Sequence, residues 1–98
     1  MKSTLASSVL ALSFFILQPP EQYSHYTGPV DEQVLPLFDA IDLCGKRVFP
    51  AFACQWFSAD FVCHIIIPRG GIFGTENEYR QHERAHCAGW SNWHEGGH

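Results

Sequence analysis

Apolar positions along the chain follow a helical spacing in one stretch and form a strand-like run in another. Between positions 34 and 44, apolar side chains fall at 34, 37, 38 and 41, which is the spacing of one helix face, and Gly45 follows as a stop. Residues 61–67 are mostly β-branched or aromatic and end at Pro68, which predicts a strand. We expect a further strand within residues 48–56, interrupted by Pro50.

The longest apolar stretch lies at the N-terminus. Lys2 precedes a run of 13 residues, 5–17, that only serines interrupt, and Pro19 and Pro20 follow it. As a helix this run would span about 20 Å, short of the roughly 30 Å of a bilayer's hydrocarbon core. The pattern predicts a secretory signal peptide over residues 1–20, with an uncleaved membrane tether as the alternative. Small residues at positions 11 and 13 fit a cleavage site, although cleavage there leaves 14–17 on the mature chain.

The next stretch, residues 21–33, combines Tyr, Ser, Gly, Pro and charged residues without a clear period, so we interpret it as a linker or an extended arm. One small domain remains over residues 34–98, a length at which a single core needs support from disulfides or metal. The net charge is −4 and the pI about 5.8, and the sequence contains no basic cluster. This balance excludes nucleic acid as an expected partner.

A capped helix is predicted over residues 76–88. Thr75 and Glu78 have the spacing of a capping box, and Gly89 stands where a left-handed residue would end the helix. Glu76 and Arg80 are four residues apart in the favourable order, which predicts an ion pair along the helix.

This helix carries the run His82-Glu83-Arg84-Ala85-His86, which spells H-E-x-x-H. Residues four apart share a helix face, so both imidazoles can reach one Zn²⁺ at about 2.0–2.1 Å. Glu83 flanks that face, where it could orient a water and take its proton as a general base. The pattern therefore predicts a zinc site with a catalytic carboxylate. A solvated His/Glu face on a surface helix is the alternative.

The run from His82 to Gly89 resembles the zincin metallopeptidases, and its glycine is similar to that of the metzincin form H-E-x-x-H-x-x-G-x-x-H. The chain departs from that form because Asn92 stands at the third-ligand position and the next histidine comes two residues later. A closer likeness is to short exported bacterial proteins with H-E-x-x-H-C-x-G-W and a later histidine, and it rests on Cys87, Gly89, Trp90 and His94. The resemblance covers about 13 of 98 residues and implies an exported peptidase.

Chain length limits the choice of a third metal ligand. Zincins that use a downstream glutamate place it on a second helix, and only 12 residues follow His86. Gly89 lets the chain reverse, and the residues after it are long enough to return His94 to the metal, so His94 is the expected third ligand. His64 and His98 are the alternatives.

Other residues near the motif have less defined roles. Asn92 is a poor zinc ligand and is expected in a turn, whereas Glu95 could serve as an oxygen ligand. Trp90 and Trp93 could wall the site or fill a small core. Tyr79, four residues before Glu83, could pack or hydrogen-bond beside it.

The cysteine count is even and the chain is short with a signal-like start, so two disulfides in an oxidising space are expected. We favour Cys63 with Cys87, tying a strand to the motif helix, and Cys44 with Cys54 as a local closure. Zinc ligation by thiolates is the alternative, although the chain lacks a C-x-x-C pair.

Together these elements predict an α+β fold in which a short antiparallel sheet packs on the H-E-x-x-H helix of a disulfide-stapled domain. The strand at 61–67 precedes that helix as the cleft-edge strand does in zincins, so it could pair with an extended peptide; an ordinary core strand is the alternative. The expected function is an exported, periplasmic or secreted zinc-dependent hydrolase, a peptidase acting on peptide or protein substrates. The alternative is a non-catalytic exported module that engages an envelope protein.

Overall fold

A three-stranded mixed sheet forms the centre of the computed structural model, which describes residues 16–46 and 51–97. The middle strand β3 (Cys63–Pro68) runs parallel to β1 (Val30–Leu35) and antiparallel to β2 (Cys54–Phe57). The expected antiparallel sheet is therefore wrong for the β1–β3 pair. A helix and a strand separate β1 from β3 along the chain, and that is enough length for the crossover that parallel pairing needs.

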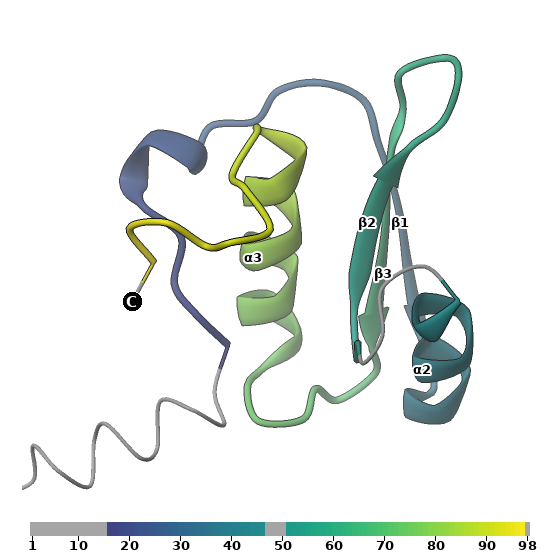
Figure 1. Cartoon of the computed structure of the whole chain (residues 1–98). Coiled ribbons are helices and arrows are strands. Elements are labelled where there is room, and N and C mark those ends of the chain that lie inside the picture. Colours follow the sequence, from purple (N-terminus) through teal and green to yellow (C-terminus); the bar gives the residue numbers. More distant parts are fainter. Residues whose placement is uncertain (1–15, 47–50, 98) are drawn as a thin grey trace, which may run out of the picture.

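The two long helices cover opposite faces of this sheet. Strand residues alternate between faces, so Cys63, Ile65 and Ile67 pack against α3 (Glu76–Cys87), while Ile66 packs against α2 (Leu37–Gly45). Figure 1 shows the sheet between the two helices, with the short turn η2 (Glu21–Tyr23) beyond α3. The α+β class and the small disulfide-stapled domain are confirmed.

Strand β1 was not predicted from the sequence. It begins at Val30, inside the stretch interpreted as a linker or extended arm, and it takes Val34 and Leu35 from the predicted helix. Pro36 explains the boundary, because the residue before a proline is driven to extended backbone. Glu32 disrupts the alternation of apolar and polar residues by which the strand could be found in the sequence. Its side chain faces α3 and accepts a 2.7 Å hydrogen bond from Arg80 Nε.

Helix α3 has the predicted capping box. The Glu78 N–H donates to Thr75 Oγ1 at 3.0 Å, and the Thr75 N–H donates to Glu78 Oε1 at 2.8 Å. The predicted Glu76–Arg80 pair is wrong, since Arg80 bonds Glu32 and the Glu76 carboxylate accepts from the Gly70 N–H at 2.6 Å. A half-buried carboxylate is the stronger partner for Arg80 than an exposed neighbour on the same helix.

Both predicted disulfides are confirmed. Cys44–Cys54 joins α2 to β2, and Cys63–Cys87 joins β3 to the end of α3. The bonds enclose 10 and 24 positions of sequence, and each is expected to stabilise the fold by about 3 kcal/mol. Each face of the sheet is therefore joined by one disulfide to the helix that covers it.

The strand predicted at 61–67 is an ordinary core strand. Strand β3 lies between β1 and β2, so both of its edges are already hydrogen-bonded. The prediction that this strand pairs with an extended peptide is therefore wrong. The further strand expected within 48–56 is found as β2 at Cys54–Phe57, and residues 47–50 lie outside the described part of the chain.

Most of the predicted signal or tether, residues 1–15, lies outside the described residues. Among residues 16–46 and 51–97, no helix combines the length and apolar character that crossing a bilayer requires. Ile16, the first described residue, packs against the core cluster between α3 and the sheet.

Candidate metal centre

Three histidines meet on the side of α3 away from the sheet. His82 and His86 lie one helical turn apart, and the segment after α3 brings His94 to them. The Nε2 atom of His86 lies 3.2 Å from His82 Nε2 and 3.2 Å from His94 Nε2. The ligand atoms of this group all lie within 4.8 Å of one another, so the group could hold a metal ion.

The opposite ring nitrogen of two of these histidines binds a backbone carbonyl. His82 Nδ1 lies 2.8 Å from the Leu17 oxygen, and His86 Nδ1 lies 2.8 Å from the Trp90 oxygen. A carbonyl oxygen only accepts, so each Nδ1 must carry the hydrogen. In the neutral rings Nε2 then holds a lone pair, and the lone pairs of His82 and His86 point toward each other.

This arrangement could accommodate a metal cation between the rings. Ligands at about 2.0–2.1 Å from a tetrahedral zinc lie about 3.3 Å apart, close to the 3.2 Å separations seen here. Carbonyl acceptors on the far nitrogen are the usual outer partners of metal-binding histidines, because they orient the ring. The geometry of this chain's residues therefore fits a metal bound through three Nε2 atoms.

A proton is a poor substitute for that cation. Burial is the main cause that lowers the pKa of all three imidazoles, and it lowers the pKa of His82 to about 4. Repulsion between the rings lowers the pKa of His82 and His94 further, while the Leu17 carbonyl acts in the opposite direction on His82. Near neutral pH the rings are therefore uncharged, which is the form that binds metal.

The return of His94 depends on how α3 ends. Gly89 has φ 107°, the Trp90 N–H donates to the Ala85 carbonyl, and the Gly89 N–H donates to the His86 carbonyl, which is the pattern of a Schellman motif. His94 itself has φ 57°, an unfavourable value for a residue with a side chain. Its N–H bonds the Ser91 carbonyl at 2.9 Å, and this turn directs the ring back to α3.

Trp90 forms the wall of the centre, whereas Trp93 does not. The Trp90 ring is 3% exposed and stacks on His86 at 5.0 Å, and its edge contacts reach His82 and His94 at 5.0 and 4.8 Å. Its indole N–H donates to the Glu95 carbonyl at 2.9 Å, which fastens the tail. Trp93 is 86% exposed. Of the two roles considered for the tryptophans, walling the site or filling a small core, Trp90 therefore has the first.

Glu83 lies deep in the fold. It is 6% exposed and makes no hydrogen bond to the described residues, and burial raises the pKa of its carboxyl to about 8. Tyr79, one turn earlier, donates its hydroxyl to the Ile72 carbonyl at 2.5 Å. Burial first and the nearby Glu83 charge second raise the pKa of Tyr79 to about 12. Tyr79 is therefore a packed core residue beside the carboxyl.

The other candidate ligands lie elsewhere. His64 is on β3 and bonds Asp31 and Ser58, and His98 is outside the described residues. The side chains of Asn92 and Glu95 are exposed, and neither belongs to the histidine group. The group of three consists of the ligands expected first.

One functional contact had no sequence signal. The Leu17 carbonyl that holds His82 belongs to the stretch predicted as a signal segment, 65 residues away in the chain. Every residue has a carbonyl, so no residue type could have marked this one.

Comparisons with known proteins add no relative: no family model, no curated protein and no solved structure matches the chain.

Proposed function

We propose that this protein is an exported zinc-dependent hydrolase, a peptidase, with His82, His86 and His94 as metal ligands and Glu83 as general base. The observation that carries the proposal is the 3.2 Å spacing of the Nε2 atoms combined with carbonyl partners on Nδ1. The H-E-x-x-H run and its likeness to zincins support the same assignment.

The ligand set favours zinc and a reactive site. Neutral imidazoles suit zinc, and three protein ligands with a free fourth position are typical of catalytic zinc, whereas structural sites have four protein ligands. Among the described residues the group contains three members. Zinc bound here would polarise a carbonyl oxygen and lower the pKa of a coordinated water.

The chain's own residues would divide the remaining work. Glu83 directly follows His82 in α3, so its carboxylate could take a proton from the attacking water and pass it to the leaving amine. A positive charge nearby would oppose the burial that raises the pKa of Glu83, and so favour the ionised base. Trp90 would keep solvent from one side of the ligands.

A second candidate is a non-catalytic exported module that engages an envelope protein and uses the same histidines for stability. One observation favours it: the Glu83 side chain is as buried as the core around Tyr79, which leaves little access for a substrate. The two disulfides agree with either candidate, since both indicate an oxidising compartment.

Zinc content and peptide hydrolysis, measured on the wild type, Glu83→Gln and His94→Ala, test the proposal. A peptidase keeps one zinc per chain in Glu83→Gln and loses turnover by at least about 100-fold, because the base is gone. His94→Ala loses metal and turnover together. Retained zinc without any hydrolysis in the wild type supports the non-catalytic module, and absence of zinc overturns both candidates.

A further inference from the structure

A second hydrogen-bonded group of polar side chains lies on the opposite face of the sheet. His64 Nε2 lies 2.8 Å from Ser58 Oγ, and His64 Nδ1 lies 3.1 Å from Asp31 Oδ2. The three residues come from three different segments: β1, β3 and the turn that follows β2. A hydroxyl, an imidazole and a carboxylate are thus joined in the order that activates a serine nucleophile.

The sheet holds this group in place. Asp31 and Trp56 are the register partners of His64 on the two neighbouring strands. The side chains of Asp31, His64 and Trp56 therefore form one row across the sheet. The Trp56 ring stacks on His64 at 5.2 Å with an interplanar angle of 15°. The indole ring therefore packs on the imidazole, and hydrogen bonds at both ring nitrogens fix the orientation of the imidazole.

The turn after β2 directs Ser58 toward the imidazole. The Ser58 N–H donates to the Val62 carbonyl at 3.0 Å, and the Phe61 N–H donates to the Ser58 carbonyl at 2.9 Å. Phe61 has φ 64°, a conformation that costs energy for an aromatic residue. Strain of this kind persists where the surrounding contacts impose it, and here they close a tight turn on the serine.

The proton positions follow from the partners. The Asp31 carboxylate accepts from His64 Nδ1–H, which leaves Nε2 to accept the hydroxyl hydrogen of Ser58. Asp60 and the Val62 carbonyl are competing acceptors for the single hydroxyl hydrogen of Ser58. A hydrogen bond from Ser58 to the Asp60 carboxylate is the main cause that lowers the pKa of Asp60. A carboxylate with a lowered pKa is a weak base, so Asp60 can accept the hydrogen bond without taking the proton.

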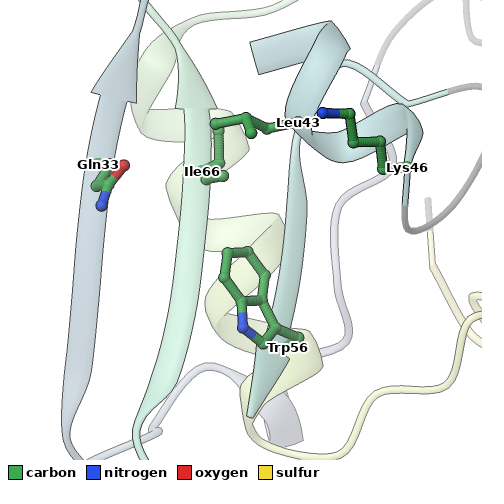
Figure 2. A pocket seen from close by; sticks show the side chains of 5 residues that line it. All are labelled: Gln33, Leu43, Lys46, Trp56 and Ile66. Carbon is green, nitrogen blue, oxygen red and sulfur yellow. The ribbon is translucent and has the colours of Figure 1, made fainter. Parts of the chain in front are cut away.

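A hollow of about 490 Å³ opens on the same face of the sheet, and Trp56, whose ring stacks on His64, is one of the residues that line it. Figure 2 shows Gln33, Trp56 and Ile66 on the strands, Leu43 on α2 and Lys46 directly after that helix around the hollow. Its volume is within the range of small-molecule sites, and it combines an apolar lining with an amide and an ammonium group. Such a lining fits a short apolar chain that ends in a polar, carbonyl-bearing group.

We propose that Ser58 is the nucleophile of a second, metal-independent site that cleaves esters of short apolar acids. Ser58 Oγ forms a bond to the ester carbonyl carbon while its proton passes to His64 Nε2. The ester C–O bond then breaks and the leaving alkoxide takes that proton. Water then gives a proton to His64 and attacks the acyl-serine, the bond from the acyl carbon to Ser58 Oγ breaks, and Oγ takes that proton back. One ester and one water thus give one acid and one alcohol.

Covalent labelling of the full chain with an alkyl fluorophosphonate tests this proposal. Ser58 Oγ would form a P–O bond and displace fluoride, with the proton leaving through His64. Intact mass and peptide mapping should show one adduct per chain at Ser58, absent from Ser58→Ala and present in Ser24→Ala, where another hydroxyl is removed. Hydrolysis of p-nitrophenyl butyrate should follow the same pattern and persist in excess chelator.

Variants of His64 and Asp31 show whether these residues activate Ser58 or whether its hydroxyl is merely exposed to the reagent. His64→Gln should slow labelling by about 100-fold, the usual contribution of a general base. Asp31→Asn should slow it at least tenfold, and Asp31→Glu should retain most of the rate, because the positioning carboxylate is kept. An adduct on another residue, no adduct on disulfide-intact protein, or a Ser58 rate unchanged in His64→Gln overturns the proposal.

Discussion

Histidines on the two sides of the sheet have different partners, and the partners define what each ring can do. On the α3 side, His82 and His86 donate from Nδ1 to neutral carbonyls and direct Nε2 toward further imidazole nitrogens. On the α2 side, His64 meets a carboxylate at Nδ1 and a hydroxyl at Nε2. The first arrangement is suited to a metal ion and the second to a proton.

The comparison also shows that burial and partners act together. Burial lowers the pKa of the clustered imidazoles, and their carbonyl partners carry no charge to oppose it fully. His64 has the Asp31 carboxylate, an anionic partner, 3.1 Å from its Nδ1. The two groups of side chains lie on different sides of the sheet and share no residue.

The largest expected effect concerns Glu83 in metal-free protein. Its pKa is about 8 in the folded chain and near 4.5 in the unfolded chain, so the folded state binds more protons between these values. The free energy of unfolding should then fall as pH rises from about 4.5 to 8, by up to about 5 kcal/mol, relative to Glu83→Gln. Urea denaturation at several pH values, with both proteins treated with chelator, measures this difference. Parallel pH profiles would show that the carboxyl is not desolvated.

The next largest effect concerns the two disulfides, one on each side of the sheet. Replacing Cys63 and Cys87 together by Ala, or Cys44 and Cys54 together, should lower the free energy of unfolding by about 3 kcal/mol in each case. Zinc affinity should decrease only in the first variant, because Cys87 is the last residue of α3 and follows His86 directly. Competition with a zinc indicator gives the affinities. Equal zinc affinities in the two variants would argue against coupling between that bond and the centre.

The Leu17 contact predicts a smaller effect on the metal side alone. A chain that starts at Pro19 lacks the carbonyl that orients His82, and loss of such an outer partner weakens metal binding by about 10- to 100-fold. Leu17→Gly keeps the carbonyl and should bind zinc within about threefold of the wild type. Any processing of the chain on export should accordingly leave Leu17 in place, which N-terminal sequencing of the mature protein can check. A mature chain that begins after Leu17 and binds zinc fully would contradict this prediction.

The smallest change is expected from His64→Gln. The ring is only partly buried, so we expect a loss of about 1 kcal/mol in the free energy of unfolding, mainly from its hydrogen bonds to Asp31 and Ser58. Zinc stoichiometry should stay at the wild-type value. Thermal denaturation with and without zinc measures both, and a loss of zinc would mean that the two faces are coupled.

Local patterns made much of the motif helix and of the histidine group predictable. The capping box, the stop at Gly89 and the four-residue spacing of His82 and His86 depend on neighbours in the chain, and the structure has all of them. The disulfide pairs were predictable because few cysteines leave few pairings. The role of this group in zinc binding and hydrolysis stays a prediction.

Contacts between distant segments were not predictable from local patterns. Strand β1 has charged residues on both faces, and one of them, Glu32, is compensated by Arg80 on α3. The parallel pairing of β1 with β3 depends on where the crossover lies in space. The Asp31–His64–Ser58 group depends on that register, and the Leu17 carbonyl on the fold of the N-terminal segment.

X-ray absorption at the zinc edge tests the central claim most directly. The purified, disulfide-intact chain should contain one zinc with three nitrogen scatterers from imidazole rings at about 2.0–2.1 Å and one further oxygen ligand. His94→Ala should bind zinc in less than stoichiometric amount, and any zinc that it retains should have one imidazole fewer in its shell. Sulfur scatterers near 2.3 Å, or no zinc bound in stoichiometric amount, would contradict the assignment of His82, His86 and His94 as the metal ligands.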